Sequence, residues 1–213
     1  MNGKQVKRIL YVEDEKALTD SFEEFVREDQ DGLSGRWRVK LEIARCIEDA
    51  DRVLDTNDFD GLILDLMLPR LRADLRGLAD LNQRRLELVR EFFNLSNRRP
   101  GQAGTVQAEQ LEQEMTEVRA QIVELDFQIG ELINVNGGCE IAENLARKRD
   151  PQSIPPVLSL PVVFLTARGL PKAKERCGAV VEARSLRILE KPLPEEDVLR
   201  ELFGLFDDLE GRQ

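Results

Sequence analysis

Along the first part of the chain, short apolar runs alternate with segments in which apolar residues recur at helical spacing. The run over residues 8–12 ends in acidic residues, after which apolar positions recur at helical spacing as far as Val26. Strict alternation over residues 37–43 predicts a second strand, and the spacing over residues 47–54 predicts a second helix. The run over residues 61–65 is apolar on both faces, which is typical of a central strand in a parallel sheet covered by helices.

The pattern changes after Pro69, because residues 70–135 carry helical spacing without a strand pattern. One seam is made of Leu71, Leu75, Leu78, Leu88, Phe92 and Leu95. A second seam steps alternately by four and three residues, which is an unbroken heptad repeat. Its members are Leu111, Met115, Val118, Ile122, Leu125, Ile129 and Leu132. The segment 99–104 between the seams predicts a turn.

The two helical segments carry opposite charge. Residues 70–99 contain eight arginines and four acidic residues, for a net charge of +4. Residues 105–133 contain one arginine and seven acidic residues, for a net charge of −6. Since opposite charges favour pairing, we expect the segments to form an antiparallel helical hairpin.

Strand and helix patterns resume after the hairpin. Apolar spacing over residues 141–146 indicates a helix, and residues 149–160 form a proline-containing loop. Buried strands are predicted over residues 161–166 and 186–190, followed by an amphipathic helix over residues 198–206. The chain is therefore expected to be α/β, with residues 1–69 and 136–213 forming one domain and residues 70–135 inserted in it.

Composition limits the classes of protein to which this chain can belong. The 213 residues have a net charge of −10, so an overall electrostatic attraction to nucleic acid or to an anionic membrane is excluded. No apolar run approaches the roughly 20 residues of a membrane span, and residues 2–9 lack a secretory signal pattern. We therefore expect a cytoplasmic protein that binds neither nucleic acid nor membrane.

The chain contains no histidine, which excludes catalytic pairs of histidine with serine or cysteine, as well as imidazole metal sites. Any chemistry must use carboxylates, hydroxyls and amines. The cysteines Cys46, Cys139 and Cys177 are widely spaced and odd in number. We therefore expect reduced thiols buried in the core rather than a disulfide set or a zinc site.

Polar side chains stand at the ends of four predicted strands: Glu13 and Asp14, Asp65, Thr166, and Lys191. The carboxyl ends of strands in a parallel α/β sheet lie along one edge, where ligands bind. Three carboxylates gathered there repel one another, and a bound Mg²⁺ ion is the simplest way to neutralise that repulsion. An ionised Asp65 would attack a transferred phosphoryl group. The Thr166 hydroxyl and the Lys191 ammonium would stabilise the negative charge of that group.

Four motifs in order complete the pattern: Val-Glu-Asp-Glu, Leu-Asp-Leu-Met-Leu-Pro, Phe-Leu-Thr-Ala and Glu-Lys-Pro. Together they resemble the receiver domains of two-component response regulators over residues 7–69 and about 136–208. The resemblance implies a flavodoxin-like (CheY-like) fold: a five-stranded parallel sheet in three α/β/α layers. It also implies a phosphoryl group accepted from a histidine kinase or a phosphotransfer protein, with Mg²⁺ as the cofactor.

The resemblance assigns a role to each matching residue. Asp65 corresponds to the phospho-acceptor, and Asp14 to a direct metal ligand with Glu13 beside it. The backbone carbonyl of Met67 would complete the metal site. Thr166 resembles the switch hydroxyl, and Lys191 resembles the cation that contacts the phosphoryl group.

The chain departs from the family in three places. Ile188 stands where an aromatic residue is common, three residues before the lysine, and the segment from Gly178 to Lys191 is longer than usual. The largest departure is the hairpin, which enters directly after the phospho-acceptor strand. We expect this hairpin to be the output element, through homodimerisation or by docking a partner helix.

We expect a stand-alone receiver that signals by phosphorylation rather than an enzyme. One alternative is a phosphorylation-independent scaffold with the receiver fold. A more distant alternative is a phosphatase of the haloacid dehalogenase type, which also uses Asp, Thr or Ser, and Lys. That class places a second aspartate two residues after the nucleophile, where this chain has Met67.

Overall fold

The computed structural model describes residues 4–28, 33, 36–98, 106–167 and 170–211. The chain divides into two compact units. The first combines Met1–Arg72 with Asn134–Gln213, and the second is Ala73–Ile133. The second unit is thus an insertion between two stretches of chain that fold together.

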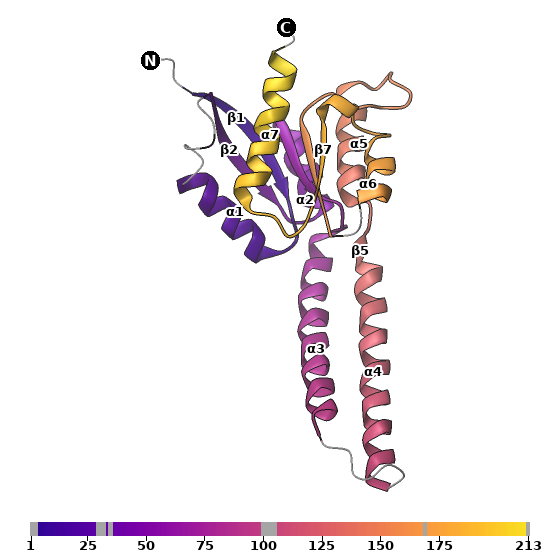
Figure 1. Cartoon of the computed structure of the whole chain (residues 1–213). Helices are drawn as coiled ribbons and strands as arrows, with labels where there is room; N and C mark the ends of the chain where they lie inside the picture. The colour runs from indigo at the N-terminus through magenta and orange to yellow at the C-terminus, as the bar shows by residue number, and fades with distance from the viewer. Residues whose placement is uncertain (1–3, 29–32, 34–35, 99–105, 168–169, 212–213) are drawn as a thin grey trace. The chain divides into compact units, whose positions relative to one another are not determined.

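A parallel sheet forms the centre of the first unit (Figure 1). Its strands lie in the order β2-β1-β3-β6-β7, and every neighbouring pair is parallel. This order confirms the predicted flavodoxin-like sheet, in which the topology reverses between the first and third strands. The strands are β1 (Gln5–Val12), β2 (Trp37–Ala44), β3 (Gly61–Asp65), β6 (Val162–Thr166) and β7 (Leu186–Glu190).

Helices cover both faces of this sheet. Helices α1 and α7 pack on one face, whereas α2, α5 and α6 pack on the other. The bounds are α1 (Lys16–Glu28), α2 (Ile47–Thr56), α5 (Gly137–Arg149), α6 (Leu170–Cys177) and α7 (Glu195–Glu210), with a 3₁₀ turn at Ala183–Ser185. Each helix of the described residues is too short or too polar to span a membrane.

The central strand β3 is buried along its whole length, as its two-sided apolar pattern predicts. Successive side chains of a strand point to opposite faces, so Ile63 enters the core beneath α1 and α7. Leu62 and Leu64 enter the core beneath α2 and α5. Each fully buried side chain of this kind contributes about 1.5–3 kcal/mol, which fixes the strand and the carboxylate at its end.

The second unit contains two long helices, α3 (Arg72–Ser96) and α4 (Val106–Leu132). Ion pairs join Arg85 to Asp126 and Arg98 to Glu114, so α3 runs antiparallel to α4. The buried seam residues are Leu78, Leu95, Val118 and Leu125. At the base, a Cβ at Gly77 would lie 3.2 Å from Leu132. The predicted turn over 99–104 lies outside the described residues.

Two details of the helical insertion differ from the sequence prediction. Leu71 is half exposed and precedes α3, so it does not join the seam. Ile133–Asn134 forms a two-residue strand, β5, which pairs with β4 at Leu68–Pro69. A ladder this short is too brief to produce an alternating pattern.

Polar contacts within the first unit hold the chain at the point where it enters the insertion and at the point where it returns. Arg70 lies 3.0 Å from Glu140 of α5, and Arg72 lies 2.9 Å from Asp49 of α2. On the returning side, the Asn134 amide donates to Glu140 over 2.6 Å. The segment directly after β3 is therefore tied to helices on the same face of the sheet.

The first turn of α5 packs on the backbone at the end of β3. A Cβ at Gly138 would lie 2.5 Å from the carbonyl oxygen of Asp65, and a Cβ at Gly137 would lie 2.7 Å from the Cβ of Leu68. Only glycine leaves room for so close an approach. The two glycines therefore set the distance between α5 and the loop that follows Asp65.

We expect Gly138→Ala to lower the free energy of unfolding by about 1–3 kcal/mol, because a methyl group would overlap the backbone of Asp65. Gly204→Ala in α7 is the matched control, since a methyl group there meets no described atom within 4 Å. That variant should gain about 0.5–1 kcal/mol. Urea denaturation measures both changes, and equal effects would contradict the close packing of α5.

Candidate functional site

Three carboxylates meet at the carboxyl edge of the sheet. Glu13 and Asp14 follow β1, and Asp65 ends the adjacent strand β3. One oxygen from each lies within 4.8 Å of the others, and Glu13 and Asp65 are buried. We call Glu13, Asp14 and Asp65 the acidic cluster.

Lys191 supplies a positive charge to the acidic cluster. Its Nζ lies 2.8 Å from Oδ2 of Asp65 and also contacts the Glu13 carboxylate. The residue follows β7, and its backbone N–H donates to the Thr166 carbonyl over 2.8 Å. Burial alone would lower the pKa of Lys191, but Asp65 and Glu13 outweigh it and raise this pKa. Lys191 is therefore held in its charged form.

Thr166 and Met67 both lie beside Asp65, Thr166 on the adjacent strand and Met67 two residues later in the chain. Thr166 is buried at the end of β6, the strand beside β3, in which Leu165 is the register partner of Asp65. The Met67 N–H donates to Oδ1 of Asp65 over 3.2 Å. The two oxygens of Asp65 are thus held by different groups, a backbone amide and the Lys191 ammonium.

Burial and mutual repulsion perturb the acidic cluster. Burial, followed by the charge of Asp65, raises the pKa of Glu13 to about 7 despite the opposing effect of Lys191. The same two causes raise the pKa of Asp14. The cluster therefore favours a bound proton, which a cation would displace.

Two further residues support the cluster, and the sequence analysis did not single them out. Tyr11 of β1 lies close to the Glu13 carboxylate, and burial, followed by the charge of Glu13, raises the pKa of Tyr11. Arg45, between β2 and α2, donates from Nη2 to the carbonyl oxygen of Asp14 over 2.5 Å. Tyr11 stands two residues before Glu13, and that placement is the signal that could have indicated it. Arg45 follows β2, where none of the four motifs lies, so the sequence carries no comparable signal for it.

The donor set fits a hard divalent cation. Mg²⁺ prefers oxygen ligands and is usually held by one or two carboxylates together with water. The acidic cluster offers carboxylate oxygens from three residues within reach of one another. Burial, followed by the charge of Asp65, raises the pKa of Glu13 and of Asp14 although Lys191 opposes the shift, so a further positive charge would stabilise the ionised cluster.

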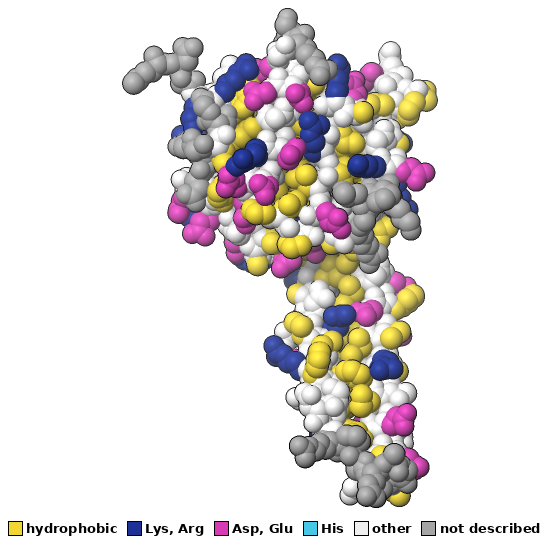
Figure 2. Space-filling view, viewed as in Figure 1, with side chains coloured by type: hydrophobic (Ala, Val, Ile, Leu, Met, Phe, Trp, Pro, Cys, Tyr) yellow, Lys and Arg dark blue, Asp and Glu magenta, His cyan; other side chains and the backbone are white. Residues whose placement is uncertain are grey.

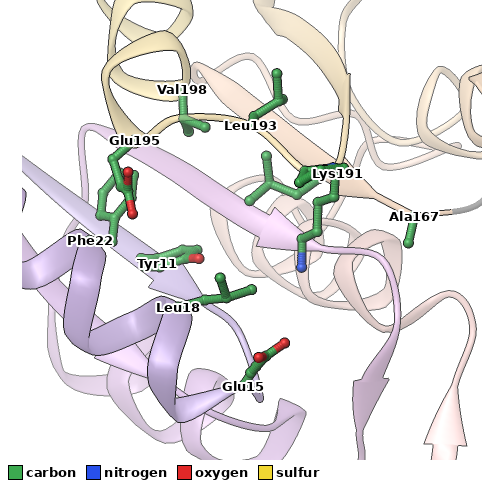
Figure 3. Close-up of a pocket in the computed structure, with 11 residues that line it drawn as sticks. Tyr11, Glu15, Leu18, Phe22, Ala167, Lys191, Leu193, Glu195 and Val198 are labelled. Atoms are coloured by element: carbon green, nitrogen blue, oxygen red, sulfur yellow. The ribbon is translucent and has the colours of Figure 1, made fainter.

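A pocket of about 350 Å³ opens beside Lys191 (Figure 3). Tyr11, Leu18 and Phe22 line it from β1 and α1, and Val198 lines it from α7. The stem of Lys191 lines the pocket while its ammonium reaches Asp65. An apolar hollow thus adjoins the charged site.

The metal-free protein should lose stability as pH rises from 5 to 8, because Glu13 holds its proton more tightly when folded than when unfolded. Its folded pKa of about 7 lies above the ordinary 4.5, so the proton-bound contribution is complete below 4.5 and lost above 7. Linkage makes this loss on the order of 2–3 kcal/mol. Glu13→Gln should flatten the dependence, whereas Glu24→Gln at an exposed site of α1 should leave it intact. Urea denaturation in EDTA at several pH values measures it, and a dependence unchanged by Glu13→Gln would contradict the assignment.

Comparison with known proteins identifies the fold. No family model and no curated protein matches the sequence. Among solved structures, a CheY-like response regulator receiver domain protein from Methanospirillum hungatei JF-1 is similar, with a TM-score of 0.51 and 14% identity. That comparison covers 98% of this chain and 100% of the other. A Francisella response regulator receiver domain gives a TM-score of 0.50 and 13% identity, over 95% and 98% of the two chains. The first unit is thus built on the CheY-like fold of response regulator receiver domains.

Proposed function

We propose that the protein is a phospho-accepting receiver of a two-component system, with Asp65 as the acceptor. The contact between Lys191 and Asp65 inside the acidic cluster supports this proposal most directly. A buried carboxylate with both oxygens held in place is oriented for attack on phosphorus. Since the chain contains no histidine, a phosphohistidine donor belongs to a partner, either a histidine kinase or a phosphotransfer protein.

The transfer forms a bond between an oxygen of Asp65 and phosphorus, while the bond from phosphorus to the donor breaks. Lys191 already contacts Asp65 and would neutralise an oxygen of the incoming phosphoryl group. The Thr166 hydroxyl, at the end of the adjacent strand, would donate to another. Glu13, Asp14, Asp65 and the Met67 carbonyl would hold Mg²⁺, which supplies charge neutralisation to the phosphoryl oxygens.

The pocket beside Lys191 offers an apolar contact for the phosphodonor protein. Its wall includes Leu18 of α1 and Leu193 after β7. Protein partners commonly place an apolar side chain in such a hollow next to charged contacts. The donor could therefore bind next to the lysine that contacts Asp65.

Incubation with acetyl phosphate and Mg²⁺ should add one phosphoryl group to the protein, as detected by intact mass. Asp65→Asn should abolish the addition, because an amide is not a nucleophile at this site. Asp58→Asn is the control, since Asp58 is exposed and precedes β3 at the opposite edge of the sheet. Absence of labelling in the folded wild-type protein would favour the scaffold alternative, and rapid turnover of small phosphate esters would favour the phosphatase.

We further propose that the helical hairpin α3–α4 associates with a second copy of itself. Beyond the buried seam, apolar side chains remain exposed on both helices (Figure 2). Phe93, Val123 and Phe127 are each 62% exposed, and Leu86 is 49% exposed. Leu86 and Phe93 are seven residues apart, so they share one face of α3.

A four-helix bundle would bury this second apolar surface. Two helices alone bury one seam each, whereas a bundle gives each helix a wider apolar stripe. The charges of the segments favour the arrangement, because the arginines of segment 70–99 in one copy can lie beside the acidic α4 of the other. The hairpin continues directly from the loop after Asp65, so phosphorylation has a short path to it.

The wild-type protein should sediment as a dimer at micromolar concentration. The double substitution Phe93→Glu with Phe127→Glu should raise the dissociation constant of the dimer at least tenfold and so favour the monomer. Gln110→Glu with Gln121→Glu adds the same charge at exposed positions of α4 and should preserve the dimer. Repeating the measurement with beryllofluoride tests whether Asp65 controls it. A wild-type monomer under all these conditions would rule out self-association and leave a different partner helix.

A further inference from the structure

Cys139 and Cys177 lie against each other in the core. Their sulfur atoms are 2.9 Å apart, although one cysteine belongs to α5 and the other to α6. Both are free thiols in the structure. A disulfide needs sulfurs about 2.05 Å apart, so closure requires a shift of less than 1 Å.

One of the two cysteines lines an opening at the surface. Cys139 is 7% exposed and lines a surface pocket of about 600 Å³ together with Arg176 and Asn136. Cys177 is 0% exposed. A molecule as small as hydrogen peroxide can therefore approach Cys139, while Cys177 lies behind it.

The pKa values of the two thiols are shifted in opposite directions. The hydrogen bond that the two thiols share lowers the pKa of Cys139 against the opposing effect of burial. The nearby Arg176 guanidinium lowers the pKa of both thiols. The same hydrogen bond, with burial, raises the pKa of Cys177. Because the thiolate is the reactive form and Cys139 is the more accessible thiol, Cys139 is the better-placed nucleophile of the pair.

We propose that Cys139 and Cys177 form a redox-active dithiol that hydroperoxides convert to an intramolecular disulfide, with Cys139 as the attacking and Cys177 as the resolving residue. The Cys139 sulfur attacks one peroxide oxygen, the O–O bond breaks, and the other oxygen leaves as water after protonation. Cys177 then attacks the sulfenic sulfur of Cys139, the S–O bond breaks, and a second water leaves. Two thiols lose two electrons and two protons, and one hydrogen peroxide becomes two waters.

The disulfide would connect two helices that belong to the same face of the sheet. Cys139 follows Gly138, whose backbone packs against the Asp65 carbonyl, and Cys177 ends α6. Closure would therefore restrain the first turn of α5 relative to α6. The inference stands on the two thiols and their surroundings, and it does not depend on phosphorylation of Asp65.

Peptide mapping of the folded full-length protein after hydrogen peroxide treatment tests the proposal. We expect a Cys139–Cys177 disulfide in the monomer, reversed by dithiothreitol. It should form at least roughly tenfold faster than oxidation of Cys46, the third buried thiol. Cys46→Ser is the matched control and should form the disulfide normally, because serine can also accept the N–H of Asp49 at the start of α2.

Single variants separate the two roles. Cys177→Ser should accumulate sulfenic acid at Cys139, trapped by dimedone, whereas Cys139→Ser should label Cys177 at least tenfold more slowly. Wild-type mapping decides the matter even if one variant fails to fold. The proposal is overturned if Cys46 oxidises as fast as the pair, or if the disulfide forms only after denaturation.

Discussion

Repulsion among three clustered carboxylates is the constraint on which the site depends. Glu13, Asp14 and Asp65 are held within 4.8 Å of one another at an edge where two of them are buried. Lys191 offsets part of this repulsion by contacting Glu13 and Asp65 together. The remaining excess of negative charge makes the site receptive to a proton or a hard cation, either of which would relieve the repulsion.

The fold holds this arrangement by placing each group on a rigid element. Strand β3 is buried on both faces, and its end carries Asp65 between the ends of β1 and β6. The approach of α5, which Gly138 permits, supports the backbone of Asp65 from one side. The site is therefore set by the sheet and by one helix terminus, and the long insertion leaves that framework intact.

Local patterns predicted the strands, the sheet class and the polar residues at the strand ends, because periodicity and burial can be inferred from residues that are close in the sequence. They did not reveal Tyr11 and Arg45 as supports of the cluster. The pattern marks Tyr11 only as an apolar position of its strand, and the contact of Arg45 with Asp14 joins separate elements. The three cysteines were correctly expected to be buried thiols. The contact between Cys139 and Cys177 could not be predicted, because it depends on how α5 and α6 pack and not on either sequence segment alone.

The antiparallel pairing of α3 and α4 also bears on how the chain folds. Asp65 and Leu165 are register partners in adjacent strands, yet the whole insertion separates them along the chain. Closing a long flexible loop costs conformational entropy, which slows the formation of such distant pairings. A hairpin that forms early from local contacts brings Gly77 next to Leu132 and so shortens the effective loop. The insertion can thus lengthen the polypeptide greatly while adding little to the topological difficulty of completing the sheet.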